Sequence, residues 1–336
     1  MTLPQHMQAV AIARPGEPDG LEIRTWPIPG IGENEVLIRV AAAGVNGPDL
    51  AQRRGHYDPP PGASPLAGLE VAGEIVAMGS VATGWLPGDR VMALTNGGGY
   101  AEYVAVPAGQ VLPVPTGWSV GDAAALPETW FTVTQTLVMR AGLEPQMSVL
   151  IHGASGGIGG AAIQIASILG ARPIAIVSSP AKADYAKELG AWATIDRSED
   201  IAARVMELTG EHGADRVVDV VGGPMAEINI AASAIGGHIV QISTLDGSSA
   251  KLSLRTIMAK QLTLSGSTLR PQSAETKRAI AGRIRQDLLP ALSQPGFRKP
   301  RVTVFPLAAA AEAHRAMEAR SHIGKLVLVT QFGATL

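Results

Sequence analysis

The sequence contains no cysteine. Disulfides, thiolate nucleophiles and cysteine-ligated zinc sites are therefore excluded at once. Its seven histidines are scattered, and no two of them have the i, i+4 spacing that places a pair of metal ligands on one helical face. The sequence therefore predicts no metal site, and we interpret His152 as a hydrogen-bonded structural residue.

Charge of one sign and long apolar runs are also missing. The formal net charge is −2 at pH 7, which provides no electrostatic footprint for nucleic acid or for an acidic membrane surface. No apolar stretch approaches the ~20 residues needed to cross a bilayer, and residues 1–7 lack the pattern of a signal peptide. We expect a cytoplasmic protein without a nucleic-acid or membrane partner.

The most informative segment is a glycine-rich turn at residues 153–159. A strand-like apolar run, residues 147–151, enters it, and a helix-like segment, residues 161–166, leaves it. Glycines at 153, 156 and 159 permit a tight turn and a close backbone approach to a pyrophosphate, which the helix N-terminus then binds. Ordinary strand-to-helix connections also use glycine, so the turn alone is a weak signal for a dinucleotide.

The context strengthens that interpretation. Strand-like runs follow at residues 173–177, 215–221 and 237–243, with helix-like segments between them. Strands that alternate with helices predict a doubly wound parallel sheet, the α/β architecture of a Rossmann domain.

The end of the second strand of such a domain selects the nicotinamide cofactor, because an acidic residue there favours NAD and repels the 2′-phosphate of NADP. This chain has Ser178 and Ser179 at that point, with Lys182 in the next helical turn. Two hydroxyls and a cation can bind a phosphate, so we expect NADPH. A helix cap beside a solvated turn is the structural alternative.

The flanking segments have a different pattern. Alternating apolar residues at 35–40 and short strands near 71–75, 90–94 and 103–106 indicate antiparallel β-structure. The strand at 323–329 has no βαβ partner, so the C-terminal part is expected to return to the N-terminal domain. For a chain of 336 residues we expect two domains. These are a catalytic domain of residues 1–127 plus 269–336 and an inserted NADP-binding domain of residues 128–268.

Several segments together resemble the zinc-free quinone oxidoreductases of the medium-chain dehydrogenase/reductase family, especially the tumour-suppressor-inducible subgroup. They occur in family order across almost the whole chain. The proline-rich loop after Tyr57 is specific to the subgroup, and the other motifs are specific to the superfamily. Besides the glycine turn, the segments are AGVNGPDL at 43–50, RGHYDPPPG at 54–62, GLE at 68–70, GDRV at 88–91, GGGYAEY at 97–103 and LPETWFT at 126–132.

The resemblance implies a GroES-like catalytic domain without a metal. Zinc-dependent relatives carry a cysteine where this chain has Asn46 and a histidine where it has Leu69, while Glu70 is retained and interpreted as a structural hydrogen-bonding residue. It also implies that Thr132 lies near the nicotinamide, and that Asn46 and Tyr57 line the substrate side and donate hydrogen bonds to a developing oxyanion. The structural alternatives are local backbone bonding for Asn46, loop packing for Tyr57 and a helix-turn hydrogen bond for Thr132.

The implied activity is NADPH-dependent reduction of quinones or reactive enones by hydride transfer from nicotinamide C4. Asp196 stands where relatives often have a tyrosine, and a carboxylate there would weaken NADPH binding unless Arg197 compensates. We further expect Asp49 and Arg54 to form a polar pair. The residues expected to bind the cofactor are Thr132, Gly153, Ala154, Ser155, Gly156, Gly157, Ile158, Gly159, Ser178, Ser179, Lys182, Arg197 and Ser243.

Two other functions remain open. An enoyl-thioester reductase uses the same cofactor and hydride chemistry but requires protonation of the α-carbon. A low-turnover NADPH-binding redox sensor or structural protein would retain the same glycine turn. In each case the family implies a homodimer, formed through an edge strand at residues 261–266.

Overall fold

The computed structural model describes residues 3–336. The chain divides into two compact units, which we call unit 1 (Met1–Phe131 and Arg270–Leu336) and unit 2 (Thr132–Leu269). The observed boundaries lie beside the expected ones, with two differences. Residues 128–131 belong to unit 1, where the backbone N–H of Glu128 donates to the buried carboxylate of Glu70 at 2.8 Å. Leu269 belongs to unit 2.

Unit 2 is built on a six-stranded sheet in which every pairing is parallel. The strand order is β10-β9-β8-β11-β12-β13, which corresponds to the doubly wound order 3-2-1-4-5-6. The strands are β8 (Ser148–Ile151), β9 (Arg172–Val177), β10 (Ala193–Asp196), β11 (Ala214–Asp219), β12 (Ser233–Gln241) and β13 (Thr263–Gly266).

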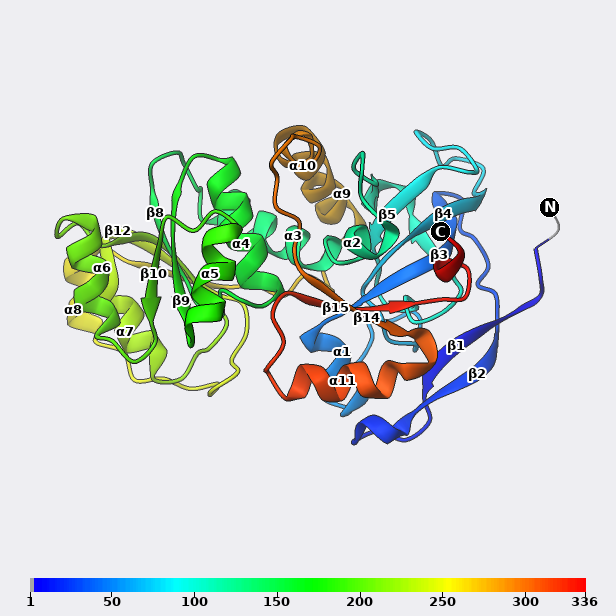
Figure 1. Cartoon of the computed structure of the whole chain (residues 1–336), viewed down its shortest axis with the longest axis horizontal. Coiled ribbons are helices and arrows are strands. Elements are labelled where there is room, and N and C mark those ends of the chain that lie inside the picture. Colours follow the sequence, from blue (N-terminus) through cyan, green and yellow to red (C-terminus); the bar gives the residue numbers. More distant parts are fainter. Residues whose placement is uncertain (1–2) are drawn as a thin grey trace. The chain divides into compact units, whose positions relative to one another are not determined.

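Helices cover both faces of this sheet, as Figure 1 shows: α4 and α5 lie on one side, and α6, α7 and α8 on the other. Because helices cover both faces, the strands of this sheet consist largely of apolar residues. Leu150, Ile174 and Val217 are among those in its core. The helices are α4 (Gly157–Ile168), α5 (Pro180–Glu188), α6 (Ile201–Thr209), α7 (Met225–Ala232) and α8 (Leu254–Lys260), preceded by a π-helical segment, Thr134–Arg140.

Unit 1 contains a seven-stranded sheet of order β14-β15-β3-β4-β5-β7, with β6 paired to β3. Its pairings are antiparallel except for β14 with β15. The strands are β3 (Glu35–Val45), β4 (Glu70–Met78), β5 (Arg90–Leu94), β6 (Tyr103–Pro107), β7 (Val111–Pro113), β14 (Val302–Pro306) and β15 (Lys325–Val329), beside a separate hairpin of β1 (His6–Ile12) and β2 (Leu21–Pro27).

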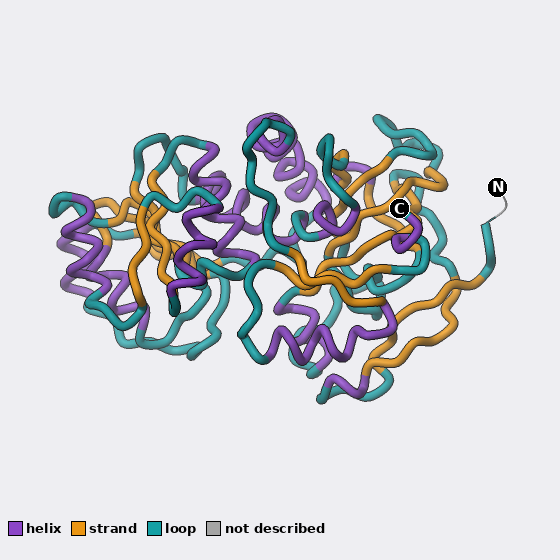
Figure 2. The backbone as a smooth tube through the Cα atoms, in the orientation of Figure 1, coloured by secondary structure: helices purple, strands orange, loops and turns teal. Residues whose placement is uncertain are grey.

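The N-terminal and C-terminal parts of the chain therefore contribute strands to one sheet. The strands of both units are drawn in orange in Figure 2. Leu326 of β15 is opposite Val45 of β3, and their side chains join a core that also contains Val71 and Ile75 of β4. The helices of this unit are α1 (Gly47–Arg53), α2 (Val120–Ala124), α9 (Ala274–Arg283), α10 (Leu289–Leu292) and α11 (Ala310–Glu318), with α3 (Pro127–Val133) at the boundary and a π-helical segment at Ile284–Leu288.

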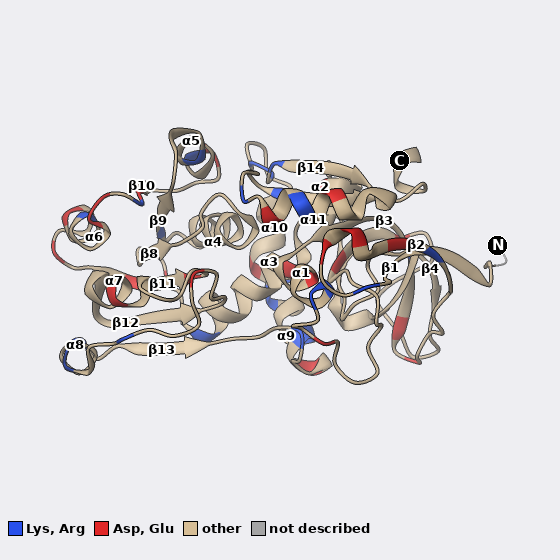
Figure 3. Cartoon of the chain, turned by 90° about the horizontal axis from the view of Figure 1, so that it is seen from below, with Lys and Arg blue, Asp and Glu red and all other residues tan. Residues whose placement is uncertain are grey.

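The expected fold class is confirmed, since a parallel α/β unit is inserted into a mainly antiparallel β unit. Figure 3 shows that Lys and Arg are interspersed with Asp and Glu along the elements of both units. Within residues 3–336, no helix combines the length and apolarity needed to cross a membrane.

Candidate functional site

The turn between β8 and α4 has the geometry of a phosphate cradle. Gly153 adopts a left-handed φ of 62°, which favours glycine. A Cβ at Gly159 would lie only 2.3 Å from the carbonyl oxygen of Gly153, so glycine is required for α4 to begin this close to β8. Gly156 precedes the first helical residue and has no capping side chain, so no side chain competes with a ligand for the N–H groups of the first turn.

The remaining predicted residues of this turn lie where a ligand could reach the backbone. Ser155, Gly156, Gly157 and Ile158 are partly exposed, whereas Ala154 is buried. The turn follows β8, whose neighbour β11 continues the sheet in the opposite winding direction. In open α/β sheets this reversal is the point at which ligands bind.

A second group of donors lies at the carboxyl end of β9. The Lys182 ammonium donates to Ser178 Oγ at 3.1 Å, and the Lys182 backbone N–H donates to Ser179 Oγ at 3.4 Å. Ser179 therefore caps α5, as the structural alternative requires, while Ser178 and Lys182 form a compact cationic donor pair. The Arg197 backbone N–H donates to Val177 O at 2.8 Å, which brings the start of the next loop to the same strand end.

Asp196 lies directly opposite Val177 in the parallel register. Its Oδ1 accepts hydrogen bonds from the hydroxyl of Ser198 at 2.6 Å and from its backbone N–H at 2.9 Å. These bonds lower the pKa of the Asp196 carboxyl, so it remains charged at neutral pH. Asp196 therefore carries the negative charge that we expected to weaken phosphate binding, and its Oδ1 already accepts hydrogen bonds from Ser198.

Two other predicted contacts lie elsewhere in unit 2. Ser243 follows β12, and its carbonyl accepts a hydrogen bond from Gln241 Nε2 at 2.6 Å. Thr132 is the first residue of the unit and is buried; its carbonyl accepts a bond from Thr136 Oγ1 at 2.7 Å. His152 is buried beneath the turn and contacts Asn229 Oδ1 at 2.6 Å, which agrees with a structural histidine. Together, the turn and the donors around Lys182 fit a dinucleotide that carries a ribose phosphate.

In unit 1, a buried ion pair lies beside Asn46, one of the two positions at which the resemblance expects a zinc ligand in zinc-dependent relatives. The Lys325 ammonium donates to Asn46 Oδ1 at 2.5 Å, to Glu70 Oε1 at 2.6 Å and to Val45 O at 3.3 Å. Asn46 Nδ2 donates to the same Glu70 oxygen at 2.8 Å. A Cβ at Gly44 would lie 2.0 Å from that oxygen, so glycine is required beside it.

This donor set does not fit a metal ion. Its oxygens already accept hydrogen bonds from an ammonium group, the adjacent Leu69 is apolar, and the chain has no thiolate to offer. Across residues 3–336, no cluster of three His, Cys, Asp or Glu side chains could hold a metal. Glu70 instead acts as a hydrogen-bond acceptor that holds Asn46, Lys325 and the start of α3 together.

Asp49 holds the loop that carries Asn46. Its Oδ2 accepts from the Asn46 backbone N–H and its Oδ1 from that of Gly68, both at 2.8 Å. Burial raises the pKa of the Asp49 carboxyl to about 6, against the lowering effect of these bonds. The expected pair between Asp49 and Arg54 is wrong: Asp49 points inward, whereas Arg54 follows the end of α1 and binds Glu318 of α11 at 2.6 Å.

Tyr57 lies beside a cationic pair from the C-terminal segment. The Arg270 guanidinium is 5.4 Å from the centroid of the Tyr57 ring and is held by Gln52 Oε1 at 2.9 Å. Lys277, which is fully buried, donates to Arg270 O at 2.7 Å and to Asn96 Oδ1 at 2.5 Å. Burial, and then the nearby Glu128, raise the pKa of the Tyr57 hydroxyl, which therefore keeps its proton at neutral pH.

Sequence reasoning assigned no site role to four residues of this region. Glu128 appeared in it only as part of a motif, and Lys325 only as part of an expected strand. A lysine at the head of an apolar strand and a glutamate between a proline and a run of apolar residues were the available signals for two of them. The other two stand in an ordinary polar segment and have no local signal. The four residues are Lys325, Glu128, Arg270 and Lys277.

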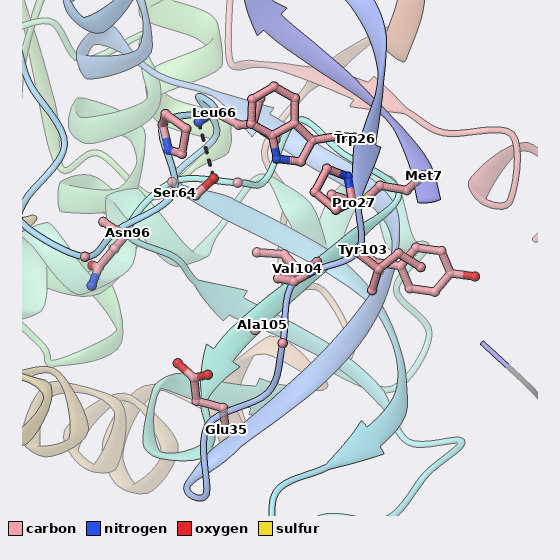
Figure 4. A pocket seen from close by; sticks show the side chains of 18 of the residues that line it. Met7, Trp26, Pro27, Glu35, Ser64, Leu66, Asn96, Tyr103, Val104 and Ala105 are labelled. Atoms are coloured by element: carbon pink, nitrogen blue, oxygen red, sulfur yellow. Dashed lines mark hydrogen bonds between the residues drawn. The ribbon is translucent and has the colours of Figure 1, made fainter. Parts of the chain in front are cut away.

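A separate groove of about 700 Å³ lies on the other side of the proline-rich loop. Residues 60–66 of that loop, residues 96–98, the end of β2 and strand β6 form its walls, and Figure 4 shows Trp26 and Glu35 in different parts of it. The Glu35 carboxylate already accepts a bond from the Gly32 backbone N–H at 2.8 Å. Neither Tyr57 nor Glu128 is among the residues that line this groove.

Two family models match the chain. The first, described as an alcohol dehydrogenase GroES-like domain, matches residues 32–116, and the second, a zinc-binding dehydrogenase, matches residues 157–282. The quinone oxidoreductase of Pseudomonas aeruginosa is 34% identical over 327 residues, which cover 95% of this chain and 98% of the relative. A phenolphthiocerol/phthiocerol polyketide synthase of Mycobacterium tuberculosis is 31% identical over 96% of this chain, which spans only 15% of that relative.

Solved structures agree. Mycobacterial Rv1454c complexed with NADPH superimposes with a TM-score of 0.83 at 30% identity, covering 96% of this chain and all of the other (100%). The CurK enoyl reductase superimposes with a TM-score of 0.83 at 26% identity, covering 97% and 100% of the two chains. This chain therefore belongs to the medium-chain dehydrogenase/reductase family of oxidoreductases and is a homologue of the quinone oxidoreductases.

Proposed function

We propose that this protein reduces quinones or reactive enones with NADPH and without a metal. The observation that carries the proposal is a contrast between the two units. The oxygens that could bind a metal in unit 1 are already hydrogen-bonded, whereas the donors of unit 2 can still bind a phosphate. Lys325 binds the side-chain oxygens of Asn46 and Glu70, so these are not available to a metal. The glycine turn and the Ser178–Lys182 donors, by contrast, leave room for a dinucleotide phosphate. A quinone accepts hydride readily because its product is aromatic, so it needs no metal to polarise it.

In this proposal unit 2 is the NADP-binding domain and unit 1 the catalytic domain. The backbone N–H groups of residues 155 and 157–159 bind the pyrophosphate, since that of Gly156 donates to Gly153 O at 2.9 Å. Ser178 and Lys182 bind the 2′-phosphate with support from Arg197, and Thr132 and Ser243 line the nicotinamide side. NADPH, when bound, supplies a hydride from C4 of its nicotinamide ring. The similarity to a protein solved with NADPH supports the choice of cofactor.

The substrate side is proposed to consist of Tyr57 and Asn46. The Tyr57 hydroxyl keeps its proton and donates a hydrogen bond to the oxyanion that develops on the acceptor. Asn46 has one amide N–H committed to Glu70, which leaves its second N–H for the substrate. Glu70 and Lys325 hold that amide in one orientation.

The test is the initial rate of oxidation of NADPH and, separately, of NADH, with an ortho-quinone, a para-quinone and an enoyl-CoA as acceptors. Quinone turnover that prefers NADPH is expected. NADPH binding without turnover of any acceptor would contradict the proposal and favour a redox sensor or structural protein.

An enoyl-thioester reductase is the second candidate. The similarity to the CurK enoyl reductase and to a segment of a polyketide synthase favours it. Turnover with the enoyl-CoA alone, in the same assay, would select this function over quinone reduction.

We also propose that the protein is a homodimer joined through β13. This strand is the edge of the unit 2 sheet, and large apolar side chains are exposed on it and on its neighbours: Ile235 is 72%, Leu254 71%, Met258 76% and Leu264 41% exposed. Exposed apolar side chains beside an unpaired edge are typical of an interface.

Sedimentation velocity tests the dimer. The double substitution Met258→Lys and Leu264→Lys is expected to yield monomers with an intact fold. Leu86→Lys, at an equally exposed position in unit 1, is the control and should leave the dimer unchanged. Wild-type protein that sediments as a monomer at micromolar concentration would refute this arrangement.

A further inference from the structure

Glu128 is a buried acid whose carboxyl group has no hydrogen-bonding partner among the residues of unit 1 that the structure describes. It is the second residue of α3, and only 9% of its surface is exposed. Its backbone N–H donates to Glu70 Oε2 at 2.8 Å, which fixes the start of the helix. No described side chain of residues 3–131 or 270–336 donates to the Glu128 carboxyl. A buried carboxylate without a partner is costly, so the neutral acid is favoured.

Charged groups from several other elements act on this carboxyl. Glu70 of β4 and Asp49 of α1 oppose its ionisation, while Lys325 of β15 and Lys277 of α9 favour it. Arg270, which also interacts electrostatically with Glu128, favours the ionised form as well. The Lys325 charge is already paired with Glu70 at 2.6 Å. Burial is the largest influence and raises the pKa of Glu128 to about 8, so the group retains its proton at pH 7.

Lys277 is a buried cation that favours the ionised form of Glu128. It is 1% exposed, and two of its three ammonium protons are bound, one by Asn96 Oδ1 and one by Arg270 O. Burial lowers the pKa of Lys277 to about 8, opposed by the attraction of Glu128. The third ammonium proton is free to stabilise a Glu128 carboxylate after the acid has lost its proton.

Tyr57 connects this acid to the substrate side. After burial, the charge of Glu128 is the largest influence on the pKa of the Tyr57 hydroxyl. Arg270 lies 5.4 Å from the centroid of the Tyr57 ring, and its carbonyl accepts the bond from Lys277. The tyrosine that is proposed to bind the oxyanion and a protonated carboxyl therefore belong to one cluster in unit 1.

We propose that Glu128 is the proton donor of the reduction, with Lys277 as the positioning residue that stabilises its carboxylate. This inference rests on the proposed function. Hydride addition to one end of a quinone or enone leaves a negative charge on an oxygen at the other end. The O–H bond of Glu128 breaks, its proton bonds to that oxygen, the electron pair stays on the carboxylate, and solvent then returns a proton to Glu128. One hydride and one proton are thus added, which yields the hydroquinone or enol.

The test compares Glu128→Gln with Glu33→Gln, an exposed glutamate in the same unit, as the matched control. For quinone reduction, kcat of the wild type is expected to be constant below pH 8 and to fall above it, because the donor must be protonated. Glu128→Gln should lower kcat by about 10²-fold and abolish this alkaline limb. KM for the quinone and NADPH affinity, from fluorescence titration, should stay unchanged.

Lys277 variants separate the two groups that titrate in this range. Lys277→Arg keeps the charge and should keep the alkaline limb, whereas Lys277→Met removes a favourable cation and should move the limb to higher pH. A limb that disappears in Lys277→Arg would assign it to the lysine and overturn the role of Glu128.

Infrared spectroscopy of the protein without cofactor gives a readout that does not depend on turnover. At pH 7.5 the carbonyl band of a protonated carboxyl should be present in the wild type and in Glu33→Gln, and absent in Glu128→Gln, while Asp49 with a pKa of about 6 is mostly ionised. Absence of that band from the wild type would overturn the inference.

The failure of this inference is distinguishable from failure of the proposed function. If the wild type reduces no quinone or enone, the proposed function fails. If the wild type turns over and Glu128→Gln retains kcat within about threefold and the same pH profile, the proton donor is wrong and the function stands.

Discussion

At the residue scale, the chemistry of unit 1 depends on which hydrogen-bond donors are not already bound to other groups of the protein. The Lys325 ammonium donates to three acceptors, and one amide N–H of Asn46 donates to Glu70. Among residues 3–131 and 270–336 the Tyr57 hydroxyl has no hydrogen-bonding partner, and burial raises its pKa. The hydroxyl is thus the donor that is most freely available to a substrate oxygen.

Tyr57→Phe is expected to lower kcat for quinone reduction on the order of 10²-fold, because one hydrogen bond to the oxyanion is lost. The affinity for NADPH and the unfolding midpoint should not change. Tyr103→Phe, which alters a tyrosine of the groove beyond the proline loop, is the control. Full activity of Tyr57→Phe would remove this hydroxyl from the mechanism.

Lys182→Ala is expected to weaken NADPH binding by about tenfold, corresponding to ~1.4 kcal/mol, through loss of one charge-assisted contact to the 2′-phosphate. NADH, which lacks this phosphate, should bind as before. Isothermal titration of both cofactors measures the difference, with Lys187→Ala at the exposed far end of α5 as the control. Equal NADPH affinity in both variants would rule out the phosphate assignment.

At the scale of elements, the turn between β8 and α4 was predictable because all its determinants are local. An apolar strand, spaced glycines and a helix-forming segment follow one another within about 20 residues, and the structure forms that order. The hairpin of β1 and β2 and strand β14 were not predicted. β2 and β14 are largely exposed, so neither contributes the buried apolar face that marks a core strand.

Gly159→Ala and Gly156→Ala should separate the two roles of glycine in this turn. A Cβ at Gly159 would clash with Gly153 O at 2.3 Å, so α4 must shift, and a loss of about 1–3 kcal/mol of unfolding free energy is expected. A Cβ at Gly156 meets Gly153 O at 3.4 Å, an ordinary contact, so stability should be kept while NADPH binds more weakly. Urea unfolding and cofactor titration of both variants measure this. Equal stability of the two would contradict the close-packing argument.

At the scale of the whole molecule, unit 1 is closed by the two ends of the chain. β15 pairs with β3, and Lys325 of β15 reaches Glu70 of β4 across a sequence separation of 255 residues. Glu70 is completely buried and Lys325 is 3% exposed, so neither charge has solvent as an alternative partner.

Lys325→Met is therefore expected to lower the free energy of unfolding by about 3–5 kcal/mol, because it leaves a buried carboxylate unpaired. The double variant Lys325→Met with Glu70→Gln should recover part of this loss. Lys299→Met breaks the more exposed ion pair with Asp122, 3.0 Å long, and should cost less than about 1 kcal/mol. Urea denaturation distinguishes these cases, and equal effects of both single substitutions would contradict the role of the buried pair.

The sequence by itself determined the fold class, the glycine turn and the donors around Lys182, since periodicity and turn chemistry act over a few neighbouring residues. The absence of cysteine likewise excluded thiolate chemistry without any structure. Only the tertiary structure decided the partners of the buried charges: Lys325 with Glu70, Glu318 with Arg54, and Lys277 within the cluster around Glu128. A buried charge is stable only beside a partner, and the partner can be far away in the sequence. Which residues meet is decided by the packing of sheets and helices, and local sequence patterns do not contain that information.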